Sequence, residues 1–268
     1  MSERENIEYK RSWIELLNVF HYLEIQGDIT ESNIHQILQK FKVPINKKEL
    51  KVKAKWKKYK EIFVYDLQDK PLFFIKELWQ PRFFREILGL HIAIHFLDKE
   101  LCPSNYMFGK WNKNKKKDIP ILITSYVKGR DFKKKELENY YFALGRQWAL
   151  HEVLSLYDVD WRHFIVQQGI LIRIDFGRCF SNLDMEYQGF WDFQYKQLLK
   201  RNAFHEGIEH EREIINKNLS RNTGHLRYLI DKLYSLNGYK NFFIDFDIAE
   251  FIDKVRTYWE KYCSIDIF

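Results

Sequence analysis

The chain has 268 residues, 46% hydrophobic and 17% aromatic, so it can bury a substantial core and is too apolar for a disordered protein. Its 44 lysines and arginines exceed its 37 aspartates and glutamates by seven. That excess favours anionic partners such as nucleotides, nucleic acids or acidic membranes, without choosing among them. The cysteines are far apart and form no CxxC pair, which argues against a disulfide framework and a zinc site. They are Cys102, Cys179 and Cys263.

The N-terminal residues 1–6 are polar and lack the apolar segment of a signal peptide. The longest apolar run, residues 87–97, contains two histidines and is too short to span a bilayer. We therefore expect a cytoplasmic protein without a membrane span. Lysine-rich runs at residues 47–60 and 110–117 are typical of solvated surfaces, and nucleic-acid binding through them is the less favoured interpretation.

Residues 1–50 are predicted to form a helical extension separate from the rest of the chain. Apolar residues recur every three or four positions between Trp13 and Leu23, and again between Ile34 and Phe41. Thr30 is a suitable cap for the second helix, and Val43-Pro44 ends it. Two short helices could form a helix-turn-helix, but an extension that packs on the remaining chain is the simpler interpretation.

The apolar pattern changes after residue 61, and residues 51–127 are predicted to form a small strand-rich unit. A hairpin is expected first, followed by a helix over residues 82–97 and then two further strands. The predicted strands are residues 62–65, 72–76, 105–108 and 119–126.

Residues 128–268 are predicted to form a larger, mostly helical unit. A break at residues 127–130 precedes a long helix over residues 137–156. A strand pair follows, and the chain reads as mostly helical from Asp184 onward. The expected class is therefore α+β, with a strand-rich lobe, a hinge and a helical lobe.

The most specific pattern lies in two loops of the second unit. Asp158 opens a short turn, and His163 stands five residues later, just before the apolar triplet Phe164-Ile165-Val166. Asp175 follows in an Ile-Asp-Phe-Gly frame. A hairpin with incidental polar residues does not explain this order and spacing.

These loops resemble the catalytic and metal-binding loops of the protein-kinase-like superfamily. The form Asp-x-x-x-x-His-Phe-Ile-Val, with Arg178 after the Ile-Asp frame, is similar to the bacterial lipopolysaccharide core kinases. The Ile-Asp-Phe-Gly frame also resembles the Bud-type and right-open-reading-frame (RIO) kinases and the phosphoinositide kinases. The resemblance is specific over residues 158–178, weaker over residues 73–132, and absent from both ends. It implies a two-lobed protein-kinase-like fold.

The resemblance also implies ATP and Mg²⁺ as cofactors and a hydroxyl group as the phosphate acceptor. Asp158 would be the catalytic base or would orient the acceptor, while His163 and Asp175 would hold the metal. Magnesium prefers oxygen ligands, so an imidazole at this place makes Mn²⁺ an alternative. Lys76, at the end of an apolar strand, would bind the phosphates, and Glu86 on the next helix would hold Lys76 in place.

The segment over residues 121–132 resembles a kinase hinge, in which the backbone of Tyr126 and Val127 would hydrogen-bond to adenine. Three departures from the family pattern are visible. Leu156-Tyr157 precedes Asp158 where a His-Gly or His-Arg pair is usual. No glycine-rich loop precedes Lys76, and His163 occupies a position where asparagine is usual.

The departures leave two other functions open. The chain could be a pseudokinase that acts as a binding scaffold without catalysis. It could also be a helical nucleic-acid binder that uses residues 10–60, which predicts strongly salt-dependent binding. The class of acceptor (protein, sugar, lipid headgroup or metabolite) is not indicated by any motif in the C-terminal helices.

Overall fold

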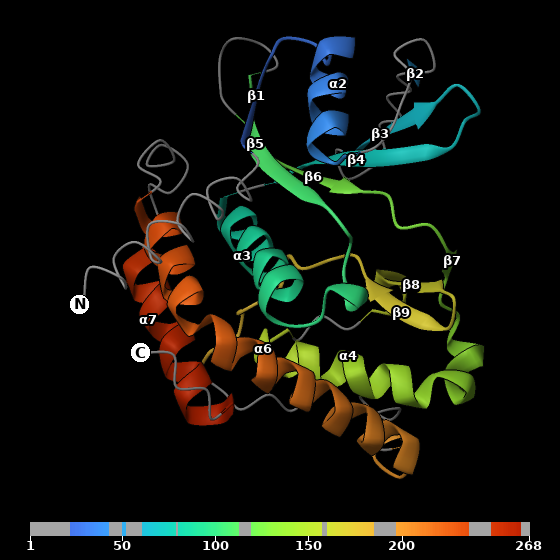
Figure 1. Cartoon of the computed structure of the whole chain (residues 1–268), viewed down its shortest axis with the longest axis vertical. Helices are drawn as coiled ribbons and strands as arrows, with labels where there is room; N and C mark the ends of the chain where they lie inside the picture. Colours follow the sequence, from blue (N-terminus) through green and yellow to red (C-terminus); the bar gives the residue numbers. More distant parts are fainter. Residues whose placement is uncertain are drawn as a thin grey trace. The chain divides into compact units, whose positions relative to one another are not determined.

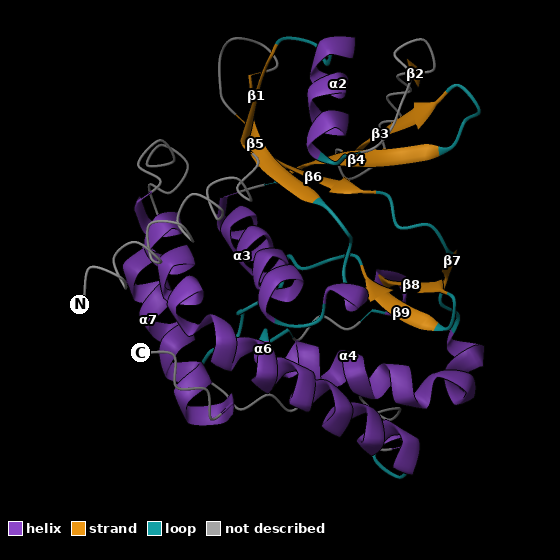
Figure 2. Ribbon diagram, in the orientation of Figure 1, coloured by secondary structure: helices purple, strands orange, loops and turns teal. Residues whose placement is uncertain are grey.

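The computed structural model describes residues 22–42, 50–51, 61–78, 80–112, 119–156, 160–184, 197–235 and 248–263. It confirms an α+β fold (Figures 1 and 2). The chain forms two compact units. The first comprises Met1–Trp79 and Asn105–Tyr126, and the second comprises Gln80–Ser104 and Val127–Phe268.

A six-stranded sheet in the order β1-β5-β6-β4-β3-β2 forms the centre of the first unit. Strand β1 runs parallel to β5, and all other neighbours are antiparallel. The predicted hairpin is β3 and β4, and the two later predicted strands are β5 and β6. The strands are β1 (Tyr22–Gln26), β2 (Leu50–Lys51), β3 (Glu61–Asp66), β4 (Pro71–Glu77), β5 (Tyr106–Asn112) and β6 (Ile119–Ser125).

Helix α2 (Glu31–Lys40) packs on this sheet, as Figure 1 shows. Thr30 caps it: the backbone N–H of Asn33 donates to the Thr30 hydroxyl at 3.3 Å, and the Asn33 side chain accepts from the Thr30 N–H. Its buried face joins the apolar side of the sheet in one core. That core includes Ile25, Ile34, Ile37, Ile62, Val64, Phe73, Ile75, Met107, Ile121 and Ile123.

The described part of the first fifty residues, mainly residues 22–42, therefore differs from the predicted separate extension. Residues 22–26 form a strand, in which Leu23 and Ile25 are buried while Glu24 is exposed. The indole N–H of Trp111 donates to the carbonyl of Gly27 at 2.7 Å, which ties the end of β1 to β5. The pairing with β5 requires a period of two, so the helical spacing does not continue through Leu23. The remainder of the first predicted helix lies outside the described residues.

The second unit is mainly helical. Helix α3 agrees with the helix predicted after Pro81 but belongs to this unit rather than to the strand-rich one. A β-carbon added to Gly89 of α3 would lie 2.3 Å from Sγ of Cys179, so α3 packs closely on the segment that follows Asp175. The main helices are α3 (Gln80–Phe96), α4 (Tyr141–Val153), α6 (Asn202–Ser235) and α7 (Ile248–Tyr258).

A small antiparallel sheet, β7-β8-β9, holds the two loops singled out in the sequence. A 3-10 helix over Lys134–Tyr140 leads into α4 and replaces the first turn of the predicted long helix. Helices α4 and α6 lie side by side (Figure 2). The strands are β7 (Arg130–Asp131), β8 (Phe164–Gln167) and β9 (Ile170–Arg173).

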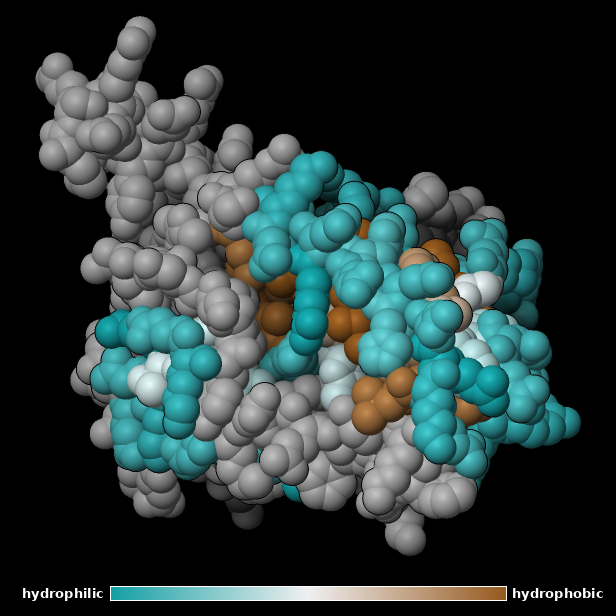
Figure 3. Space-filling model, turned by 90° about the horizontal axis from the view of Figure 1, so that it is seen from below, coloured by the Kyte–Doolittle hydropathy of each residue, from teal (hydrophilic) through white to brown (hydrophobic). Residues whose placement is uncertain are grey.

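No helix among the described residues is long and apolar enough to cross a membrane. Figure 3 shows that hydrophilic residues cover most of the described surface on the face drawn there, with smaller hydrophobic areas between them. Cys102 and Cys179 are buried free thiols.

Candidate functional site

Asp175 lies just after β9, and two hydrogen bonds fix its position. The backbone N–H of Gly177 donates to its carboxylate Oδ1 at 2.9 Å, which closes a short turn. The side-chain Nε of Arg173 donates to the Asp175 carbonyl at 2.6 Å. The carboxylate is partly exposed and is held in one orientation by the chain around it.

His163 lies beside this carboxylate. It ends a 3-10 turn, Trp161–His163, and its carbonyl accepts the backbone N–H of Ile174 at 2.9 Å. Its Nε2 is 3.7 Å from Oδ2 of Asp175. The structure thus brings together the two residues that the sequence assigns to a metal, although their metal binding remains a prediction.

Arg173 completes the arrangement and was not singled out from the sequence. It is only 1% exposed, and its Nη2 lies 3.4 Å from Nδ1 of His163. Its guanidinium also lies 5.7 Å from the centre of the Phe164 ring, a favourable cation–π distance. The available signal was one arginine inside the apolar run of residues 170–174.

The contact with Arg173 restricts the protonation of His163. A guanidinium can only donate hydrogen bonds, so Nδ1 of a neutral His163 accepts, and the ring hydrogen lies on Nε2 toward Asp175. A histidine that ligates a metal usually donates its other N–H to an acceptor instead. Metal binding through Nε2 would therefore require Arg173 to give up its contact with Nδ1.

His151, on α4, packs behind the same group. Its ring stacks on Phe164 with the centres 5.9 Å apart. Burial, with the nearby charges of Arg173 and His163, holds the pKa of His151 well below its usual value. His151 is therefore a neutral packing partner beneath the site.

Glu86 lies on α3, in the same unit as Asp175, and is 2% exposed. The charges of Glu86 and Asp175 both act on the thiol of Cys179. Burial raises the pKa of Cys179, and the carboxylates of Glu86 and Asp175 both raise it further, while Arg173 lowers it. Glu86 is therefore close enough to the segment after Asp175 to share its electrostatic environment.

Lys76 and Tyr126 belong to the first unit. Lys76 is a buried residue of β4, paired in register with Leu122 of β6. The N–H of Tyr126 donates to the Leu72 carbonyl at 2.9 Å, so it is already used. The predicted pairing of Lys76 with Glu86 remains a prediction.

Asp158 lies outside the described residues, but its neighbour Asp160 does not. The carboxylate of Asp160 accepts from the side chain and the backbone N–H of Arg162. Arg162 lowers the pKa of Asp160 to about 2. A carboxylate of such low pKa is a weak general base at neutral pH.

Within the described part of the chain, no three histidine, cysteine, aspartate or glutamate side chains are grouped as a metal site. No family model matches the chain, and no curated protein is significantly similar to it in sequence.

Proposed function

We propose that the chain is an atypical kinase-like phosphotransferase, which uses ATP and a divalent metal ion to phosphorylate a hydroxyl group. The observation that supports it most is the placing of His163 beside Asp175, with the aspartate oriented by the Gly177 N–H and by Arg173. Phosphoryl transfer depends on positioned charge more than on covalent chemistry by the protein, so an oriented carboxylate of this kind is the central requirement.

The order of elements gives a second line of support. Lys76 lies on β4, the third strand of the antiparallel series β2-β3-β4, and Glu86 lies on the helix that follows. In protein kinases the phosphate-binding lysine and its glutamate occupy a third strand and the next helix, and the metal-binding aspartate comes later, in the helical lobe. Asp175 has the corresponding place in chain order.

The donor atoms present are compatible with a divalent ion. Mg²⁺ in nucleotide sites commonly takes one or two carboxylates and completes its shell with phosphate oxygens and water, so Asp175 is a sufficient protein anchor. His163 would add a nitrogen ligand once Arg173 withdraws, and nitrogen suits Mn²⁺ better than Mg²⁺. A bound ion would neutralise charge on the transferring phosphate.

The remaining roles follow the sequence prediction. Asp158 would orient the acceptor hydroxyl and take its proton. Lys76, held by Glu86, would bind the phosphates, and the backbone at Tyr126 and Val127 would bind adenine. These four assignments stand as part of the proposal.

A pseudokinase scaffold is the second candidate, and one observation favours it. Arg173 occupies Nδ1 of His163 and leaves its Nε2 hydrogen directed at Asp175. If that contact persists when nucleotide is present, His163 supplies no metal ligand and catalysis would be weak or absent.

Thermal unfolding with ATP plus Mg²⁺, ATP plus Mn²⁺, and ATP plus EDTA separates the two candidates. A phosphotransferase should be stabilised by the metal nucleotide and should label itself or an added hydroxyl acceptor from γ-labelled ATP. A scaffold should show no label. Stabilisation by ATP that is equal in EDTA would contradict the metal assignment of the phosphotransferase.

A further inference from the structure

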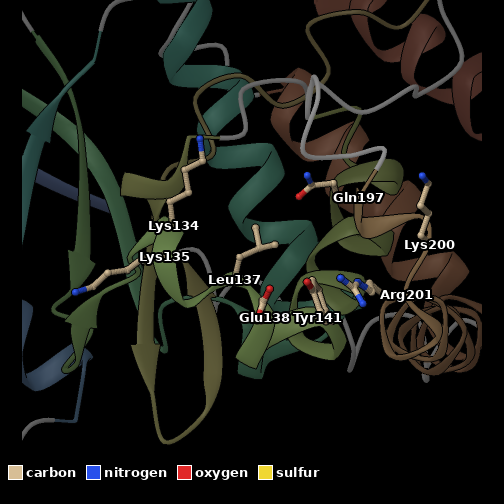
Figure 4. A pocket seen from close by; sticks show the side chains of 8 residues that line it. All are labelled: Lys134, Lys135, Leu137, Glu138, Tyr141, Gln197, Lys200 and Arg201. Atoms are coloured by element: carbon tan, nitrogen blue, oxygen red, sulfur yellow. The ribbon is translucent and has the colours of Figure 1, made fainter.

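A basic pocket lies in the second unit, away from the residues assigned to the metal. It has a volume of about 770 Å³ and is formed by the 3-10 helix before α4, the start of α4, and the segment that leads into α6 (Figure 4). Among the described residues, four basic side chains line it, Lys134, Lys135, Lys200 and Arg201, together with the carboxylate of Glu138. Pockets of this size hold small-molecule ligands.

Among the residues that the structure describes, the four basic side chains have no carboxylate partner within ion-pair distance. Elsewhere in the same unit, Arg130 pairs with Glu136, Arg146 with Asp98, and Arg212 with Glu152. Glu136, which follows Lys135 directly in the sequence, is already bound to Arg130. The pocket therefore concentrates positive charge that no carboxylate in the described part of the chain neutralises by an ion pair.

The ring of Tyr141 lies at one end of the pocket, next to Arg201. The guanidinium of Arg201 lies 5.2 Å from the centre of the Tyr141 ring, and Figure 4 shows both beside Glu138. The carbonyl of Arg201 accepts from the backbone N–H of Phe204 at 3.0 Å, so its backbone is fixed at the start of α6. Stacking uses the face of a guanidinium and leaves its edge to donate hydrogen bonds. In the same view, Lys135 points away from this end.

We propose that the pocket binds a phosphorylated small molecule that contains a ring, with its phosphate on Arg201 and Lys200 and its ring against Tyr141. A guanidinium edge matches two phosphate oxygens, and a lysine adds a second positive charge, which favours a dianion over a single carboxylate. Tyr141 and the buried Leu137 provide the apolar contact for the ring. This site shares no residue with the proposed nucleotide and metal site, so either proposal can fail without the other.

Phenyl phosphate is a suitable probe because it combines a phosphate dianion with one ring. Its affinity is measured by isothermal titration or ligand-observed NMR, beside inorganic phosphate and uncharged benzyl alcohol. We expect phenyl phosphate to bind most tightly. Arg201→Gln should weaken it at least tenfold and Lys200→Gln at least threefold. Tyr141→Leu should weaken phenyl phosphate but not inorganic phosphate.

Lys133→Gln is the matched control, because Lys133 is an exposed lysine next to Lys134 that does not line the pocket. It should leave the affinity unchanged, as should Asp175→Asn. If Arg201→Gln fails to fold, as judged by its thermal midpoint, Lys200→Gln decides the question.

Absence of saturable binding to phenyl phosphate would overturn the proposal, as would equal weakening by Lys133→Gln. So would binding of single-stranded RNA, lost in Lys200→Gln, without binding of the small probe.

Discussion

Nε2 of His163 lies 3.7 Å from Oδ2 of Asp175, and Arg173 holds the opposite nitrogen of the same ring. These two contacts decide whether His163 can bind a metal ion. The carboxylate that a metal nucleotide would need is held separately, by the Gly177 N–H and by the contact of Arg173 with the Asp175 carbonyl. The contact of Arg173 with Nδ1 gives the histidine a hydrogen on the nitrogen that would otherwise bind the metal.

Arg173 should be a positioning residue for both neighbours. Arg173→Met keeps much of the buried length but removes the hydrogen bonds to the Asp175 carbonyl and to His163. We expect a loss of about 2–4 kcal/mol in the free energy of unfolding, because buried acceptors lose a charged donor. Metal-dependent nucleotide affinity should fall about 10- to 100-fold because Asp175 loses the hydrogen bond that holds its backbone, even though the change also frees Nδ1 of His163.

Arg162→Met is the matched control for this change, since Arg162 is 85% exposed in the neighbouring turn. Its surface pair with Asp160 should contribute at most about 1 kcal/mol. Chemical denaturation of both variants measures the difference. Equal stability of the two would show that Arg173 does not hold the site together.

The segment of residues 22–41 should be essential to the first unit. Ile37 is fully buried in the shared core, so Ile37→Ala should lower the free energy of unfolding by about 2–5 kcal/mol. Gln36→Ala, at the exposed neighbouring position of α2, should change it by less than about 0.5 kcal/mol. If both variants matched the wild type in denaturation, the segment would be a separate extension after all.

Glu211 should make stability depend on pH. It is fully buried against Arg146, whose Nε donates to it at 3.0 Å, and burial raises the pKa of Glu211 to about 7 from the usual 4.5. The folded protein holds the proton of the Glu211 carboxyl more tightly than the unfolded chain does. The contribution of Glu211 to the free energy of unfolding is therefore most favourable below pH 4.5. That contribution is lost as the pH rises to about 7, and the difference corresponds to about 3 kcal/mol.

Glu211→Gln should remove this dependence, because the amide can still accept from Arg146 and does not ionise. Urea denaturation at pH 5 and pH 7.5 measures the slope. Glu213→Gln, at an exposed position of the same helix, should keep the wild-type slope. A Glu211→Gln variant with the same slope as wild type would argue against a buried, titrating carboxyl.

Gly145 should be required for the close packing of α4 on α6. A β-carbon at this position would lie 2.0 Å from the carbonyl oxygen of Phe204, which is backbone and cannot swing aside. Gly145→Ala should therefore cost about 1–3 kcal/mol, even though alanine favours a helix by about 1 kcal/mol. Ala143→Gly on the same helix is the control and measures the effect of helix propensity alone. A Gly145→Ala variant more stable than the wild type would contradict the close packing of α4 on α6.

Local periodicity predicted α2, α3 and the strands β3 to β6 because each keeps one period along its length. Strand β1 was missed because five residues carry little periodic information, and its pairing depends on β5. The Trp111–Gly27 hydrogen bond that anchors it joins residues 84 apart in sequence. Such long-range pairing cannot be read from a local pattern.

The same limit applies to the sites. The spacing of residues 158–178 brought attention to His163 and Asp175, which the structure places together. It did not indicate that Arg173 would turn toward His163, because the direction of a buried charge depends on its surroundings. The basic pocket was also missed, since Tyr141 and Arg201 meet only when α4 and α6 pack.

The central claim is that Asp175 anchors a metal-bound nucleotide. The most direct measurement is the affinity for ATP with Mg²⁺ or Mn²⁺, by isothermal titration, in the wild type, Asp175→Asn and Asp253→Asn. Asp253 is an exposed aspartate on α7 and serves as the control. We predict at least a tenfold loss for Asp175→Asn, with unchanged affinity for Asp253→Asn. Unchanged metal–ATP affinity in Asp175→Asn would contradict the assignment of this site.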